Sequence, residues 1–233
     1  MLEGRIRHPW TDRHNRRHLV TQRLVKAIRL NLALGWVQTQ FPQIKILYTL
    51  RHPCAVVSSR LKLGNWDTHL DEMLAQDQLV EDYLSPYHDT IARASDPLDR
   101  HAIMWCIENL VPLQQLNAAT THVLFYEHFC NDLIPQVKAM CQFLGRPPPS
   151  NIQDTANKPS AHTPQSSAIH QGKNLLAPWR EHLTAVQVDR VLHYVQQFGL
   201  GHLYTDDPLP HTDYHNTLTG PLTNTAAPCA PTH

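Results

Sequence analysis

The residues best suited to chemistry are an arginine and two serines that follow it, Arg51, Ser58 and Ser59. A guanidinium group presents a planar fork of N–H donors that holds a phosphate in two hydrogen bonds, and serine hydroxyls donate to the same kind of oxygen. Each hydrogen bond to a charged group contributes roughly 1.5–3 kcal/mol once water is excluded. These residue types at this spacing therefore predict a site for a phosphate or a similar anion.

The sequence around Arg51 predicts a strand, a turn and a helix. Residues 44–50 are mostly apolar, as in a strand that is buried in a parallel sheet. His52 and Pro53 turn the chain, because proline suits the first position of a helix, and residues 54–63 continue with an apolar stripe. Such a junction lies at the carboxyl edge of a parallel sheet, where α/β folds bind ligands and where a helix N-terminus favours an anion.

The remaining apolar patterns predict the rest of an α/β domain. We expect a short helix at 31–40, further strands at 24–28 and 122–126, and helices at 67–84, 97–116, 132–144 and 179–198. Gly145 is expected to end the third of these longer helices, and Thr184 to cap the last. Strands that alternate with helices indicate a parallel sheet flanked by helices.

The totals point to one domain with a tail. Of the 233 residues, we assign 1–204 to the α/β domain and 205–233 to a disordered tail rich in proline, threonine and histidine. Twenty basic and twenty acidic side chains cancel, so we expect no nucleic-acid partner. No apolar run approaches the roughly 20 residues of a membrane span.

The cysteines and histidines indicate a cytoplasmic protein without a metal. The five cysteines form no CxxC pair, which favours reduced thiols and a reducing compartment. His14 and His18 have helical spacing, but arginines surround them and no third ligand follows from the pattern, so no metal site is expected. The sequence does not indicate an oligomeric state.

Four segments in order resemble the sulfotransferases that use 3′-phosphoadenosine-5′-phosphosulfate (PAPS). Arg51-His52-Pro53, with Ser59 eight positions after the arginine, is similar to their 3′-phosphate-binding segment. FYEHF at 125–129 with CQFLG at 141–145 resembles the family's strand ending in Tyr-Glu and its helix ending in Phe-Leu-Gly. WCIEN at 105–109 and WREHLT at 179–184 also resemble family landmarks. The likeness runs from about residue 24 to residue 204 and implies a P-loop-NTPase-like sulfotransferase fold.

The resemblance implies an enzyme that moves a sulfuryl group from PAPS to a hydroxyl or amine of a small molecule or glycan. Arg51 and Ser59 would bind the 3′-phosphate, and Lys173 would assist from a loop that closes over the nucleotide. Lys26 would face the sulfuryl group, unless it is only a charge at a strand edge. Glu108 is either an acceptor-site group or a helix-surface carboxylate. Glu127 either orders the nucleotide loop or caps the following turn.

One expected part of the family's site is not found in the sequence. The family holds the 5′-phosphosulfate in a loop after its first strand, and such a cradle requires glycines, whereas Gly4 is the only glycine before Lys26. We therefore expect the chain to lack its first strand–helix unit and to be inactive by itself. The alternative is a non-catalytic remnant domain whose basic N-terminal region binds a nucleotide or an acidic partner.

Overall fold

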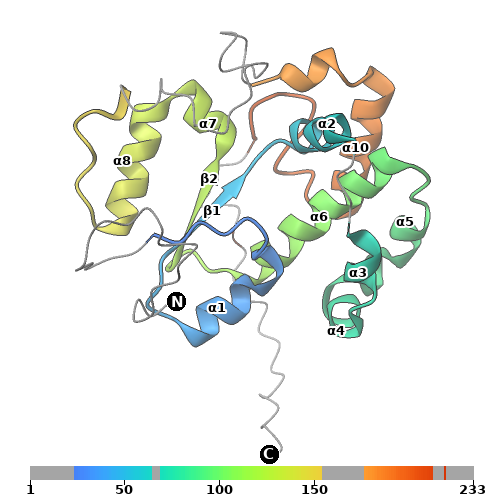
Figure 1. The fold of residues 1–233 in the computed structure, drawn as a ribbon, viewed down its shortest axis with the longest axis horizontal. Helices are drawn as coiled ribbons and strands as arrows, with labels where there is room; N and C mark the ends of the chain where they lie inside the picture. Colours follow the sequence, from blue (N-terminus) through green and yellow to red (C-terminus); the bar gives the residue numbers. More distant parts are fainter. Residues whose placement is uncertain (1–23, 65–68, 154–175, 212–217, 219–233) are drawn as a thin grey trace, which may run out of the picture.

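The computed structural model describes residues 24–64, 69–153, 176–211 and 218. At its centre is a parallel sheet of β1 (Ile46–Leu50) and β2 (Thr121–Phe125), paired from Ile46 opposite Thr121 to Leu50 opposite Phe125. Figure 1 shows α8 (Leu133–Leu144) on one side of the sheet, and α6 (Pro97–Gln115) with α2 (Pro53–Leu63) and α10 (Ala185–Gln197) on the other. The predicted class, α/β with a parallel sheet flanked by helices, is confirmed.

The predicted strand, turn and helix around Arg51 are confirmed. Alternate residues of β1, Ile46, Tyr48 and Leu50, are buried, as expected where one face of a strand packs on the core. Helix α2 (Pro53–Leu63) begins at the predicted proline and ends before Gly64, whose φ of 63° lies in the region that glycine tolerates best.

Helix α6 is the element against which the others pack. Asp96 caps its first turn by accepting a hydrogen bond from the Asp99 N–H, and Pro97 occupies the first helical position. Tyr48 donates a hydrogen bond to the side chain of Asn109 at 2.8 Å, which ties β1 to the helix. Both α2 and α10 (Ala185–Gln197) contact α6, so β1, α2 and α10 share one apolar core with it.

Two of the predicted elements are wrong. Residues 24–30 form no strand, and Leu24 and Ile28 are 82% and 77% exposed, because a strand needs a neighbour for its backbone groups and these residues have none among the described ones. They lead into η1 (Asn31–Ala33) and α1 (Leu34–Gln40). The expected helix at 67–84 is divided into α3 (Leu70–Leu74), α4 (Asp77–Leu79) and the π-helical turn η2 (Val80–Leu84).

The reason for that division is the burial pattern of the segment. Among its described residues only Leu70 and Leu84 are buried, so no continuous apolar stripe holds one long helix against the core. The 3-10 turn η3 (Ser85–Tyr87) and the short α5 (His88–Ala92) then lead to α6. None of the helices in the described ranges is long and apolar enough to cross a membrane.

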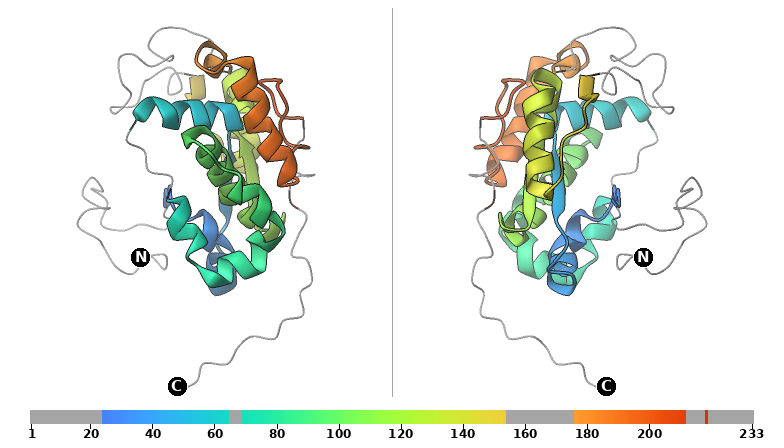
Figure 2. Two further views of the ribbon diagram at one scale, coloured as in Figure 1. Left: turned by 90° about the vertical axis from the view of Figure 1, so that its right-hand side faces the viewer. Right: turned by 90° about the vertical axis from the view of Figure 1, so that its left-hand side faces the viewer.

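The second half of the chain follows the prediction more closely. Helix α7 (Tyr126–Asn131) begins directly after β2, and α8 ends at Gly145, whose φ is 68°. After η4 (Pro178–Glu181), Thr184 and Gln187 form a capping box at the start of α10. The right-hand view of Figure 2 shows α8 in front of the strands of the sheet.

Part of the predicted tail contacts the core. Residues 205–211 are described, and the Thr205 carbonyl accepts a hydrogen bond from the side chain of His52 at 3.0 Å. Leu218 packs against the core as well. The other residues of the predicted tail lie outside the described ranges, and the domain boundary after residue 204 stays a prediction.

Candidate anion-binding site

Arg51 lies at the carboxyl end of β1 and is half-buried, and its guanidinium group makes no hydrogen bond or ion pair with the described residues. Its Cζ atom lies 4.5 Å from the centroid of the Tyr126 ring, over the ring face. Its Nε atom is buried and has no hydrogen-bond partner. Within the described residues no carboxylate forms an ion pair with it, although a cation removed from water normally acquires a counter-ion or hydrogen bonds. Such a group is suited to receive an anion from outside the chain.

The two residues that follow β1 contact the two residues that follow β2. Beyond the last pair of the ladder, Leu50 with Phe125, Arg51 meets Tyr126, and the His52 N–H donates to Glu127 Oε1 at 2.8 Å. Tyr204 donates its hydroxyl to Glu127 Oε2 at 3.0 Å.

Glu127 is only 1% exposed, and this burial raises the pKa of its carboxyl group. Its two oxygens thus order the loop after β1 and join it to the C-terminal part of the chain. Of the two interpretations of Glu127, the one in which it orders the loop after β1 agrees with these contacts.

His52 is fully buried in an aromatic cluster. Its ring stacks on Trp179 with centroids 4.8 Å apart and meets the Tyr204 ring edge-on at 5.1 Å. Nδ1 accepts the Cys54 N–H at 3.2 Å, while Nε2 donates to the Thr205 carbonyl. Burial lowers the pKa of His52 to about 4, so the ring is neutral at physiological pH and acts as a structural cap.

The hydrogen bonds of the first turn of α2 are made inside the chain. The Cys54 N–H bonds to the His52 ring, and the N–H groups of Ala55 and Val56 bond to the His52 carbonyl at 3.0 and 3.1 Å. Pro53 has no N–H to offer. An anion at this edge would therefore be held by side chains and not by the end of α2.

The two serines of α2 have different surroundings. Ser58 is buried at 4% exposure and is not available to a ligand, so it is not one of the anion-binding groups expected from the sequence. Ser59 is exposed, and its hydroxyl makes no hydrogen bond to the described part of the chain. The structure thus leaves Arg51 and Ser59, on consecutive elements, as the two free polar side chains of the predicted site.

Of the two predicted lysines, the structure describes only Lys26. Lys26 is exposed in the irregular segment before η1, and Lys173 lies outside the described residues. Glu108 is paired instead with a cation of the neighbouring helix, since Arg60 Nη2 lies 2.7 Å from Glu108 Oε2. This pair links α2 to α6, which agrees with the helix-surface interpretation of Glu108.

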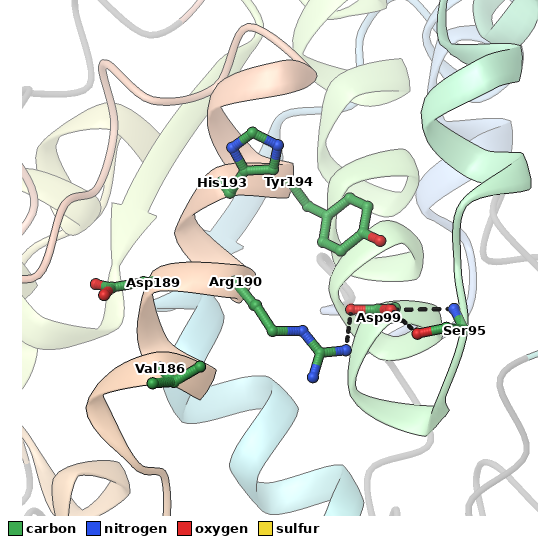
Figure 3. A pocket seen from close by; sticks show the side chains of 7 residues that line it. All are labelled: Ser95, Asp99, Val186, Asp189, Arg190, His193 and Tyr194. Carbon is green, nitrogen blue, oxygen red and sulfur yellow. Dashed lines mark hydrogen bonds and ion pairs between the residues drawn. The ribbon is translucent and has the colours of Figure 1, made fainter.

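A separate cavity of about 560 Å³ lies between α10 and the start of α6. Figure 3 shows Arg190 extending from α10 toward Asp99, with Ser95 on the other side of the Asp99 carboxylate. Arg190 Nη2 donates to Asp99 at 2.7 Å and to Asp96 at 2.8 Å, and Asp99 also accepts from the Ser95 hydroxyl and N–H. These polar groups satisfy one another, so the cluster is an ion-pair clamp between two helices.

Sequence reasoning did not find this clamp or the partners of Arg51. The sequence marks Tyr126 as part of a strand-end motif and Glu127 as a residue that orders a loop or caps a turn, but it carries no signal that pairs them with Arg51, His52 or Tyr204. Among the described residues, no group of three His, Cys, Asp or Glu side chains is arranged to hold a metal ion.

Comparison with known proteins agrees with the features of this edge. A family model described as "Sulfotransferase family" matches residues 7–150, which include β1, Arg51, Ser59, β2 and Glu127. No curated protein and no solved structure matches the chain significantly. The family match spans more than half of the 233 residues and places the strand-end arginine within the matched region. The chain belongs to the sulfotransferase family.

Proposed function

We propose that the protein binds the 3′-phosphate of PAPS with Arg51 and Ser59 and transfers the sulfuryl group to a hydroxyl or amine of a small molecule or glycan. Membership of the family supports sulfuryl transfer in general. The observation that carries the finer proposal is the Arg51 guanidinium, which is half-buried, lies over the Tyr126 ring and forms no direct ion pair within the described residues.

The residues at this edge fit a phosphate. Arg51 has N–H donors that no described acceptor occupies, and a phosphate accepts two of them in parallel. Ser59 lies six residues beyond Pro53, about 9 Å further along the axis of α2, and adds a hydroxyl donor from the next element. Hydrogen bonds from Arg51 and Ser59 would fix the nucleotide at its 3′-phosphate.

The nucleotide itself supplies the group that is transferred, and the chain binds and orients it. Transfer of this kind depends mostly on positioning and on neutralising the charge that develops on the bridging oxygen. We assign Lys26 to that second task and Lys173 to the 3′-phosphate. Both assignments are proposals from the sequence. We also propose a reducing, cytoplasmic setting, which the unpaired state of Cys54, Cys106, Cys130 and Cys141 fits.

The direct test compares two nucleotides that differ at one phosphate. 3′-Phosphoadenosine-5′-phosphate and 5′-AMP are titrated calorimetrically into the folded protein. We expect the bisphosphate to bind at least about tenfold more tightly, because each hydrogen bond from a cation to phosphate contributes roughly 1.5–3 kcal/mol. Arg51→Ala is expected to remove that preference, and Ser59→Ala to reduce it.

Arg146→Ala is the matched control, because it removes an exposed arginine just after α8, away from both strand ends. It should retain the preference of the wild-type protein. Equal affinities for the two nucleotides in the wild-type protein would refute the assignment of the 3′-phosphate site. That result would favour a non-catalytic remnant domain.

A further inference from the structure

Two neighbouring residues at the start of α7, directly after β2, support Arg51 and the backbone beside it. In the order of the parallel ladder, Tyr126 follows the last paired residue of β2 just as Arg51 follows the last paired residue of β1. The next residues, His52 and Glu127, are joined by a hydrogen bond. The side chains of Tyr126 and Glu127 thus keep the two chain segments in contact for two residues after the backbone ladder ends.

Tyr126 acts on the side chain of Arg51. The Cζ atom lies 4.5 Å from its ring centroid, within the range in which a cation is attracted to an aromatic face. The ring covers one face of the guanidinium group and leaves its edge, which carries the N–H donors, for another ligand. An arginine held in this way loses less rotamer freedom when it binds an anion than one that is free in solvent.

Glu127 acts on the backbone next to Arg51. It accepts the N–H of His52 at 2.8 Å and the hydroxyl of Tyr204 at 3.0 Å, and it is almost completely buried. The carboxylate makes no direct ion pair with Arg51 among the described contacts, although the two charges attract each other at longer range. It also acts on the guanidinium through the fixed peptide of residue 52.

We infer that Tyr126 and Glu127 are positioning residues that hold Arg51 in the conformation that receives a phosphate. The inference rests on the proposed function for the identity of the ligand. According to this inference, discrimination between nucleotides with and without a 3′-phosphate depends on the two residues that follow β2 as well as on Arg51 and Ser59. It also gives Tyr204, which lies beyond the family match, a part in holding the site.

The test uses Tyr126→Phe and Tyr126→Leu, alone and combined with Arg51→Ala. Tyr126→Phe keeps the aromatic face, so its affinity for 3′-phosphoadenosine-5′-phosphate is expected within about twofold of wild type. Tyr126→Leu removes the face and is expected to weaken that affinity by about threefold to thirtyfold while leaving 5′-AMP binding unchanged. Glu127→Gln should also weaken the bisphosphate selectively.

The combined variant separates positioning from general stability. If Tyr126 acts through Arg51, Tyr126→Leu has no further effect once Arg51 is alanine. A loss that is equal for both nucleotides, or that persists in the Arg51→Ala background, would overturn the inference. If Arg51→Ala removes the preference but Tyr126→Leu leaves it intact, the inference fails and the proposed function stands.

An NMR measurement on the protein without nucleotide tests the positioning of Arg51 even if the proposed function is wrong. The Nε–H resonance of Arg51, identified by its loss in Arg51→Ala, is expected upfield of the other arginines and slow to exchange, since the ring lies over the guanidinium and Nε is buried. It should move to the ordinary position in Tyr126→Leu and not in Tyr126→Phe. An ordinary, rapidly exchanging resonance in the wild-type protein would refute the positioning role.

Discussion

Acidification is expected to destabilise the fold through His52. Burial, reinforced by the charge of Arg180, lowers the pKa of its imidazole from 6.5 to about 4. The unfolded chain therefore takes up a proton at His52 before the folded protein does, and the contribution to stability that is present above about pH 6.5 is lost as the pH falls to about 4. A tenfold change in proton affinity is equivalent to about 1.4 kcal/mol, so the loss from this residue is about 3 kcal/mol.

The geometry explains why the ring resists protonation. Nδ1 accepts a hydrogen bond from the Cys54 N–H at 3.2 Å. A proton on Nδ1 would break this hydrogen bond and bring two N–H groups into repulsive contact. Nε2 already donates to the Thr205 carbonyl, and no solvent reaches the ring. A loss of about 3 kcal/mol is a large part of the total stability of a typical domain, which is about 5–15 kcal/mol.

The measurement is urea unfolding followed by circular dichroism between about pH 7 and pH 4.5, for the wild-type protein and His52→Asn. Asparagine is a good helix cap that does not titrate, although it loses the stacking on Trp179 and lowers stability at neutral pH. The variant should therefore show a shallower fall in unfolding free energy over this range. His101 and His128, whose pKa values are also lowered by burial, are common to both proteins and cancel in the comparison. Parallel pH profiles would refute the reasoning.

Three further changes test the contacts that hold the fold. Glu127→Ala leaves the His52 N–H and the Tyr204 hydroxyl without an acceptor, so it should lower the free energy of unfolding in urea by about 3 kcal/mol or more. Glu127→Gln should lower it by about half as much. Equal losses in the two variants would contradict this account. Arg190→Leu leaves the buried Asp99 carboxylate with Ser95 alone and should cost about 1–2 kcal/mol, a modest value because Arg190 is 38% exposed. An unchanged melting temperature would argue against the clamp. Thr184→Ala should cost about 1 kcal/mol by removing the capping box, whereas Thr184→Ser should retain most of it.

Sequence reasoning succeeded where local chemistry decides the conformation. Pro53 starts α2, Gly145 ends α8 and Thr184 caps α10, as expected from the backbone preferences of these residue types. The position of Arg51 between a strand and a helix also follows from the apolar run before it and the proline after it. These features depend on neighbours within about eight residues, so they can be read without knowledge of the tertiary structure.

The same reasoning failed where an element depends on a distant partner. Residues 24–28 have the composition of a strand, but they have no neighbour among the described residues and remain exposed. Ser58 and Ser59 are equivalent as sequence, and only the packing of α2 shows that Ser58 is buried and Ser59 is not.

What only the tertiary structure decided is the set of contacts that support the arginine. The hydrogen bond from His52 to Glu127 joins residues 75 positions apart, and the one from Tyr204 to Glu127 spans 77. The first depends on the parallel register of β1 and β2, which also places Arg51 beside Tyr126, and the second on the packing of the segment after α10. The sequence by itself predicted which residue would face an anion, because residue type and local spacing suffice for such a prediction. Its orientation required the fold, because side chains far apart in the chain meet only after the strands have paired and the core has closed.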